Sequence, residues 1–166
     1  MKFNVYQGSI VEPKEKVDAI VTLVNPGPIW AGNVDMAIKH VSYHFHQELA
    51  ERIANIKTCC LVRSNTTLLR FRNVLFVIDD LSKPLEELVY TALLKANLHG
   101  FSHIALPVFR TGTMLGCVEK TKEEAVLAMI KGFHQFKAKY PISRLATIDI
   151  VVYNDPEAEA LFNENL

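Results

Sequence analysis

Asn25 and Asp35 are the two side chains in this sequence whose types and positions could do chemistry together. Asp35 lies in the first turn of a predicted helix, where the helix dipole keeps a carboxylate ionised and able to orient a water molecule. Asn25 ends an apolar strand and could hydrogen-bond a ligand hydroxyl. Each residue also has a purely structural alternative: Asp35 could only stabilise the helix start, and Asn25 could form an Asx-type turn before Pro26.

The elements that must position these two residues form the stretch 17–38. VDAIVTLV is β-branched and nearly continuously apolar, which is typical of an interior strand covered on both faces. The Asn-Pro-Gly-Pro segment 25–28 ends the strand, because its two prolines remove backbone donors and fix φ. Apolar residues then recur at helical spacing, which predicts one continuous helix over 33–54 that includes His46.

A second loop, Arg110 to Gly116, follows the strand predicted over 103–109. Its two glycines could admit a phosphate close to the backbone, although such a loop more often means tight turns. Arg110 could clamp an anion or remain a solvated side chain. Because ligand crevices in α/β sheets lie at the carboxyl ends of strands, both loops occupy suitable positions, and loop amides can bind phosphate without a basic cluster.

Further strands are predicted over 2–6, 58–62, 74–78 and 146–152. Ser82 and Pro84 open a helix that Gly100 closes. The spacing of Thr121 and Glu124 predicts a capping box at the start of the next helix, and Asp155-Pro156 predicts an N-cap for a C-terminal helix. Strands and helices alternate, which predicts a layered α/β fold with a largely parallel sheet between helices.

The composition predicts a single globular unit, since 166 residues with 49% hydrophobic content can bury a sizeable core. Lysine plus arginine equals aspartate plus glutamate at 18 each, so no broad charge attracts nucleic acid or an anionic membrane. The chain shows no membrane-length apolar run and opens on a strand-like segment instead of a secretory leader. The expected location is the cytoplasm.

The cysteines and histidines predict neither a disulfide framework nor a metal site. Cys59 and Cys60 are neighbours and Cys117 lies alone, which matches no zinc spacing and favours reduced thiols. His40 and His44 stand four apart on a predicted helix, but no carboxylate or cysteine set completes a metal motif. Cys117 is interpreted as a small loop residue, because no paired histidine is identifiable.

The chain resembles the macrodomains, a family that binds ADP-ribose and in several branches hydrolyses ADP-ribosyl derivatives. The family pattern VDAIVNAAN, followed by glycines and then by VD and AI, is similar to residues 17–38, where VDAIV is retained in full. Asn25 matches the second asparagine, and Val34-Asp35 and Ala37-Ile38 match the helix start. A second signature, a strand ending in proline before a Ser/Gly-Thr-Gly loop, resembles Ala105-Leu106-Pro107 followed by Arg110-Thr111-Gly112. The resemblance covers nearly the whole length.

This resemblance implies a three-layer α/β/α fold around a central mixed, largely parallel sheet, with residues 1–166 forming one macrodomain. It implies ADP-ribose or a mono-ADP-ribosylated protein as the partner, with ADP-ribose a ligand, no cofactor and no metal, and no sequence-specific nucleic acid or membrane. The catalytic residues would be Asn25, at the distal ribose, and Asp35, which would position or activate water. The implied ligand-binding residues are Ser9, Ile10, Asn25, Gly32, Asn33, Val34, Arg110, Thr111, Gly112, Thr113, Met114, Leu115, Gly116, Tyr153 and Asn154.

The sequence departs from the family pattern at several ligand positions. Ser9 replaces the aspartate that recognises the adenine amino group, and Thr22 replaces the first motif asparagine. Trp30 interrupts the glycine run, and could either cover a ribose or pack into the core. Tyr153 could stack on a base or cover the sheet edge. The function implied is hydrolysis of mono-ADP-ribosyl proteins or of O-acyl-ADP-ribose, with a non-catalytic ADP-ribose reader and a degenerate interaction domain as alternatives.

Overall fold

A computed structural model describes residues 1–27 and 29–166, so Pro28, one of the two prolines predicted to end a strand, lies outside the described residues. At its centre a six-stranded sheet has the order β1-β6-β5-β2-β4-β3. Neighbouring strands are parallel except for the antiparallel pair β3–β4, so the predicted mixed, largely parallel sheet is confirmed. The strands are β1 (Lys2–Gln7), β2 (Val17–Val24), β3 (Cys59–Arg63), β4 (Phe71–Ile78), β5 (His103–Pro107) and β6 (Thr147–Val152).

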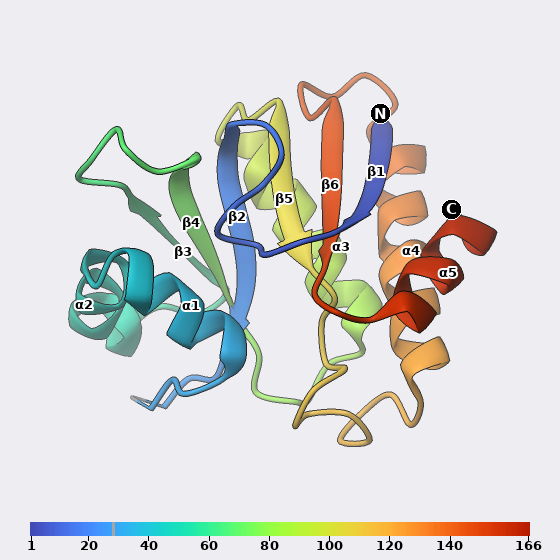
Figure 1. Ribbon diagram of the computed structural model, residues 1–166, viewed down its shortest axis with the longest axis horizontal. Helices are drawn as coiled ribbons and strands as arrows, with labels where there is room; N and C mark the ends of the chain where they lie inside the picture. The colour runs from blue at the N-terminus through green and yellow to red at the C-terminus, as the bar shows by residue number, and fades with distance from the viewer. Residues whose placement is uncertain (28) are drawn as a thin grey trace.

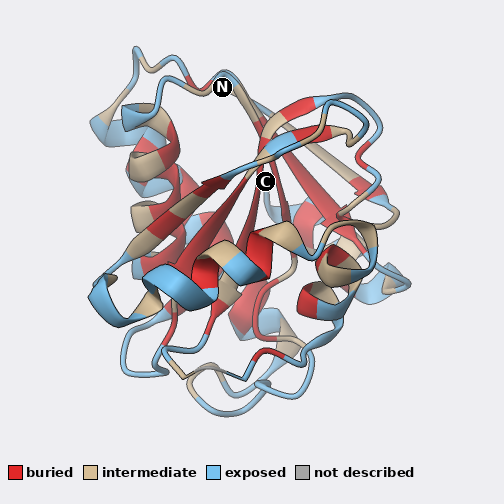
Figure 2. Ribbon diagram, turned by 90° about the vertical axis from the view of Figure 1, so that its left-hand side faces the viewer, coloured by how far each residue is buried: buried red, intermediate tan, exposed pale blue. Residues whose placement is uncertain are grey.

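Helices cover both faces of the sheet, which gives the predicted three layers (Figure 1). One hydrophobic core lies between the sheet and α3 (Leu85–Leu98), α4 (Lys122–Lys139) and α5 (Pro156–Asn165). The other lies under α1 (Asn33–Val41) and α2 (His44–Arg52), which the short 3₁₀ helix Ile53–Asn55 follows. Figure 2 shows the buried strands enclosed by helices whose outer faces are exposed. Within residues 1–27 and 29–166, no helix is long and apolar enough to cross a membrane.

The N-caps predicted at Thr121 and Asp155 and the closing Gly100 are confirmed. The Thr121 hydroxyl accepts a hydrogen bond from the amide of Glu124 at 3.1 Å, and the Asp155 carboxylate accepts one from the amide of Ala158 at 3.1 Å. Gly100 follows α3 with φ +77°, the left-handed conformation typical of a glycine after a helix. Each of these features depends on residues that are neighbours along the chain.

Ser82 does not cap α3, whose N-cap is Pro84 without a side-chain hydrogen bond. The capping box is only half formed, because the Glu124 carboxylate accepts a hydrogen bond from the Lys120 amide instead of the Thr121 amide.

The helix predicted over 33–54 is broken, and here the sequence-based prediction is wrong. Ser42 is extended, with φ −163° and ψ 114°, and its amide caps the carbonyl of Ile38 at 2.9 Å. A valine, this serine and a tyrosine occupy 41–43, and all three residue types are weaker helix formers than alanine or leucine. Periodicity alone did not register the break. His40 and His44 consequently lie on different helices.

The connection 8–16 crosses the same sheet face as α1 and α2 (Figure 1). Tyr6 anchors it: its hydroxyl donates to the Asp149 carboxylate at 3.1 Å and accepts a hydrogen bond from the amide of Lys14 at 3.1 Å. The Arg70 side chain also donates to the carbonyls of Pro13 and Lys14. Burial is the main reason why the pKa of Tyr6 is raised to about 12. This connection is therefore held against the sheet on the side that carries Asp35.

Candidate functional site

The predicted ligand residues follow the carboxyl ends of neighbouring strands. The strands β1, β6, β5 and β2 are parallel and adjacent, so the segments after them meet at one edge of the sheet, called here the carboxyl edge. Ser9 follows β1, Tyr153 follows β6, the loop 108–121 follows β5 and Asn25 follows β2. The Gly8 amide donates to the Val152 carbonyl at 2.8 Å, which ties the first two segments together.

Asn25 holds its own loop. The side-chain Oδ1 accepts a hydrogen bond from the Gly27 amide at 2.9 Å, and Nδ2 donates to the Ile29 carbonyl at 3.0 Å. The first of these bonds is the Asx-type turn that the sequence offered as the structural alternative. The residue is nevertheless exposed, so its side chain can exchange these bonds for others. The Asx-type turn is thus present, and the ligand role of Asn25 stays a prediction.

Trp30 packs into the core, which decides between its two alternatives. Only 4% of the residue is exposed, and it belongs to the core cluster beneath α1 and α2. Its indole Nε1 donates to the Asn25 carbonyl at 3.0 Å, so the polar end of the ring is satisfied as well. The Lys39 ammonium donates to the Trp30 carbonyl at 2.5 Å. This ring therefore supports the ligand loop from below.

Asp35 lies in the first turn of α1, as predicted, but it is buried and paired. The imidazole Nε2 of His46 lies 2.9 Å from its Oδ1, and the two side chains are 2% and 12% exposed. Its second oxygen, Oδ2, is near Gly32, since a Cβ placed on that glycine would lie 3.5 Å from it. The sequence did not predict His46, which was assigned only to a helix. The available signal was a histidine next to Phe45 on the apolar side of that helix.

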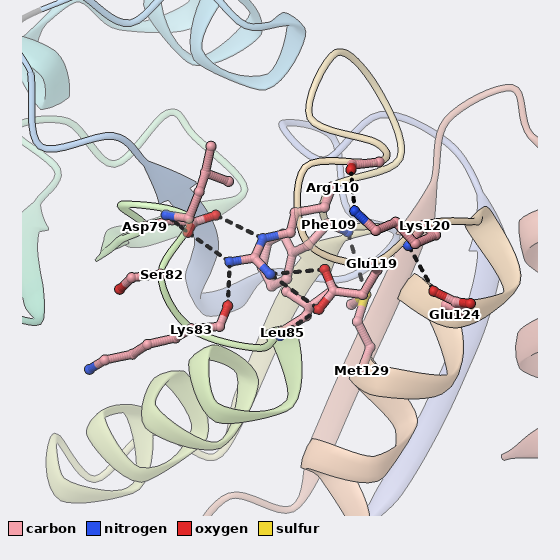
Figure 3. Close-up of polar contacts among 12 residues, drawn as sticks. Asp79, Ser82, Lys83, Leu85, Phe109, Arg110, Glu119, Lys120, Glu124 and Met129 are labelled. Carbon is pink, nitrogen blue, oxygen red and sulfur yellow. Dashed lines mark hydrogen bonds and ion pairs between the residues drawn. The ribbon is translucent and has the colours of Figure 1, made fainter.

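Arg110 is buried, so of its two alternatives the solvated side chain is wrong. The guanidinium donates to both oxygens of Asp79, at 3.0 and 2.8 Å, to both oxygens of Glu119, at 3.2 and 2.9 Å, and to the Lys83 carbonyl at 2.8 Å (Figure 3). These five hydrogen bonds match the five N–H donors of an arginine. A phosphate could be clamped by this side chain only after some of the bonds break. We call these four residues the Arg110 cluster.

The Arg110 cluster joins the connection between β4 and α3 to the loop between β5 and α4. Asp79 follows β4, Lys83 precedes α3, and Glu119 precedes α4. Glu119 also accepts a hydrogen bond from the Leu85 amide at 2.7 Å, which caps the start of α3 (Figure 3). Burial by itself lowers the pKa of Arg110, but hydrogen bonds to Asp79 and Glu119 outweigh it and raise that pKa. The arginine stays charged, and the cluster fixes the root of the second ligand loop.

The second loop has hydrogen bonds inside its later half. The Leu115 amide donates to the Gly112 carbonyl at 3.1 Å, the Gly116 amide to the Glu119 carbonyl at 3.0 Å, and the Cys117 amide to the Met114 carbonyl at 3.2 Å. Residues 112–117 are exposed, and Gly116 has φ +90°. The loop is therefore anchored at both ends while its backbone faces solvent. Cys117 is an exposed free thiol there.

The residues predicted at the adenine end differ in exposure. Tyr153 is 76% exposed and so does not pack on the sheet edge, which leaves its ring accessible. Asn154 is exposed with φ +47°, Ser9 is half-buried, and Ile10 is buried in the core. Asp18, which the sequence did not assign to this end, lies at the start of β2, where it accepts hydrogen bonds from the Ser102 and His103 amides.

Two cavities, of about 520 and 500 Å³, lie along α4. The first is lined by Met1, Tyr140 and Leu145 among others, near the start of β6 and so at the end of the sheet opposite the carboxyl edge. Neither is lined by a predicted ligand residue, so the candidate site is placed by its chemistry and its position on the sheet. Among the described residues, no group of three or more histidine, cysteine or acidic side chains could hold a metal ion.

Comparison with solved structures identifies the fold. The chain is similar to the Trypanosoma brucei macrodomain in complex with ADP-ribose, with TM-score 0.77, 20% identity and coverage of 98% of this chain and 68% of that one. The Oceanobacillus iheyensis macrodomain with ADP gives TM-score 0.71, 18% identity and coverage of 97% and 87%. The macro domain of ganglioside induced differentiation associated protein 2 gives TM-score 0.75, 14% identity and coverage of 98% of this chain and 81% of that one.

These likenesses show that the chain has the macrodomain fold, as the sequence motifs predicted. In crystal form 1 of the Trypanosoma brucei macrodomain, the match spans 65% of that chain's length. No protein-family model matches the chain. No curated protein sequence matches it. The fold is therefore established by tertiary structure at low sequence identity.

Proposed function

We propose that this protein is a macrodomain that binds ADP-ribose along the carboxyl edge of its sheet. The observation that carries the proposal is the order of the segments. The strand order β1-β6-β5-β2 places Ser9, Tyr153, the loop 108–121 and Asn25 side by side. By the family resemblance, the first two would bind the adenine end of ADP-ribose, the loop its diphosphate and Asn25 its distal ribose, which is the order of these groups along the ligand. Three strand spacings of about 4.8 Å span about 14 Å, a length suited to a dinucleotide-like ligand.

The diphosphate would be bound by backbone amides. The amides of Leu115, Gly116 and Cys117 are hydrogen-bonded within the loop, so the donors to a phosphate would come from the preceding residues, Thr111 to Met114. Clustered backbone amides can bind an anion without basic side chains. This fits a chain with equal numbers of acidic and basic residues, and an Arg110 whose donors are already engaged.

The distal ribose would be bound next to Asn25 and Gly32. Binding through the Asn25 side chain would require it to release the Gly27 amide or the Ile29 carbonyl. The ligand therefore replaces hydrogen bonds that the loop makes with itself, which lowers the net gain from each new bond. We therefore expect each hydrogen bond from Asn25 to add little to the affinity, whereas the exposed ring of Tyr153 can stack on a base without rearrangement.

Hydrolysis of a mono-ADP-ribosyl derivative, either a modified protein or O-acyl-ADP-ribose, is the second part of the proposal. Its support is the Asp35 carboxylate, of which Oδ2 lies beside Gly32 at the loop. A water held there would attack the anomeric carbon or the linked ester, with Asp35 accepting its hydrogen bond. The rival is a reader that binds without turnover, favoured by the replacements at Thr22 and Trp30. A degenerate interaction domain is favoured by Ser9.

A paired assay tests both parts. ADP-ribose is titrated calorimetrically into the wild type and the Asp35→Asn variant, and release of ADP-ribose from a mono-ADP-ribosylated protein is then followed. Asp35→Asn preserves the shape of the buried side chain, and Asp80→Asn is the control, because Asp80 is an exposed carboxylate after the neighbouring β4. We expect both variants to bind, and Asp35→Asn alone to lose release by about 100-fold or more.

Each outcome separates the alternatives. A wild type that binds no ADP-ribose would remove both parts of the proposal and favour the degenerate domain. Binding without release in the wild type would leave the reader. Release that survives Asp35→Asn would keep the enzyme class and reject Asp35 as its catalytic residue.

A further inference from the structure

The contact between Asp35 and His46 exists only because the helix predicted over 33–54 is broken. Eleven residues separate the two side chains, and on one straight helix they would lie about 16 Å apart along its axis. The extended residue Ser42 turns α2 back toward α1, and the His46 Nε2 lies 2.9 Å from the Asp35 Oδ1. The fold thus brings a titratable ring into direct contact with the carboxylate that the proposed function uses.

The surroundings of His46 determine which of its nitrogens carries the proton. Its Nδ1 is buried and has no hydrogen-bond partner among the described residues. A proton on Nδ1 would be a buried donor without an acceptor, which is unfavourable. An imidazole with a single proton here therefore carries it on Nε2, because the Asp35 carboxylate facing that nitrogen can only accept. Trp30 and Phe76 hold the ring in place, with centroids 5.9 and 5.2 Å away.

The two oxygens of Asp35 are consequently not equivalent. Oδ1 accepts the hydrogen bond from His46 inside the core. Oδ2 is near Gly32, and a Cβ added to this glycine would lie 3.5 Å from it. With Oδ1 fixed, rotation of the carboxylate is restricted and Oδ2 is directed toward the loop. A carboxylate that must orient a water gains from such restriction, because a displacement of about 1 Å can lower a rate by about 100-fold.

We propose that His46 is a positioning residue for Asp35, holding Oδ1 so that Oδ2 alone faces the ligand loop at Gly32. The kinetic consequence rests on the proposed function, but the tautomer of His46 and the orientation of Asp35 do not. His46 is buried beneath the loop and has no predicted contact with ADP-ribose. Its removal therefore lowers kcat and leaves KM and ADP-ribose affinity nearly unchanged.

Substitutions at position 46 separate hydrogen bonding from packing. His46→Gln keeps a donor near the place of Nε2, whereas His46→Phe fills the space without a donor. We expect kcat for ADP-ribose release to fall about 10- to 100-fold in His46→Phe, with KM changed less than threefold, and to recover in His46→Gln. His44→Gln is the matched control, since His44 lies two residues earlier in α2 and its imidazole Nε2 lies 3.0 Å from the Arg63 carbonyl.

Two further variants keep the proposal testable if His46→Phe does not fold. His46→Asn retains a polar amide but is one bond shorter than glutamine, so it should resemble the phenylalanine variant in kcat. Gly32→Ala places a methyl group 3.5 Å from Oδ2 and fits the backbone at φ −65° and ψ 164°. We expect it to lower kcat while leaving the fold intact. Equal kcat in the glutamine and asparagine variants, or unchanged kcat in Gly32→Ala, would overturn the proposal.

A measurement on the ligand-free protein distinguishes this proposal from the proposed function. Nitrogen-15 NMR of the imidazoles should show His46 with its proton on Nε2 in the wild type, and a shifted Nε2–H resonance in Asp35→Leu. A proton on Nδ1 alone would refute the positioning role even if the protein hydrolyses its substrate. If the wild type releases no ADP-ribose, the proposed hydrolysis fails, and the NMR result alone accepts or rejects the contact.

Discussion

Replacing Arg110 by methionine should destabilise the protein far more than replacing an exposed cation. Methionine keeps much of the side-chain volume and removes the charge. It would leave Asp79 and Glu119, whose side chains are 8% and 9% exposed, without the guanidinium that now binds all four of their oxygens. Breaking a buried ion pair by removing one partner costs about 3–5 kcal/mol. Against a typical domain stability of about 5–15 kcal/mol, this is a large fraction.

The backbone of Arg110 does not complicate this comparison. Arg110 has φ +56°, a left-handed conformation that is strained for any residue with a side chain. Methionine carries the same strain, so the strain cancels between the two proteins. Lysine keeps the charge but has no planar fork to reach both carboxylates, and we expect Arg110→Lys to lose stability by an intermediate amount.

Urea denaturation followed by circular dichroism provides the test. For Lys131→Met, the control, the ammonium lies 2.7 Å from Glu86 but the lysine is 63% exposed, so the expected loss is about 1 kcal/mol or less. For Arg110→Met we expect about 3–5 kcal/mol, or a fall in Tm on the order of 10 °C for a chain of this length. If Arg110→Met lost no more stability than Lys131→Met, the ion pairs of Arg110 would be screened by solvent like those of a surface residue. That result would refute the claim that their burial makes them costly to break.

Three further predictions concern other parts of the fold. Tyr6 has a pKa of about 12 against an ordinary 10.0, so the folded state holds this proton more tightly. The free energy of unfolding should be constant below pH 10 and fall by about 2 kcal/mol as the pH rises toward 12. Urea titrations of Tyr6→Phe should show no such fall. Gly132→Ala should destabilise α4 despite alanine's higher helix propensity, because its Cβ would lie 2.8 Å from the Glu86 carbonyl and 2.9 Å from Val89; a rise in Tm would contradict that packing. Thr121→Ala removes the N-cap of α4 and should lower the free energy of unfolding, measured by chemical denaturation, by about 1 kcal/mol. Thr121→Ser keeps a capping hydroxyl and should keep most of this stability. Equal losses in both variants would argue against the cap.

Most of the elements could be predicted from the sequence, because their signals are local. The β-branched run 17–24 and the capping pairs at Thr121 and Asp155 involve residues a few positions apart, and hydrogen bonds over that range depend little on the rest of the chain. The break at Ser42 was missed although its signal was also local. Periodicity favours one helix, and the weaker helix propensity of residues 41–43 is a small effect beside it.

The candidate site was predicted less completely, because its contacts join distant residues. Arg110 lies 31 positions from Asp79 and 9 from Glu119, and no spacing rule pairs them. One signal was available: acidic residues at the end of β4 and just before α4 lie where a buried charge needs partners. For Trp30 the sequence left two alternatives of similar weight, since an indole suits either a ligand or a core. Its burial decided between them.

The sequence by itself determined the order of strands and helices, the two loops at strand ends, and the position of Asp35 in a first helical turn. These follow from hydrophobic period and capping chemistry, which act over one or two turns of chain. Only the tertiary structure decided that Arg110 is buried among carboxylates and that His46 contacts Asp35. Both are contacts between side chains that are distant in sequence, and only the packing of the elements against the sheet brings those side chains together.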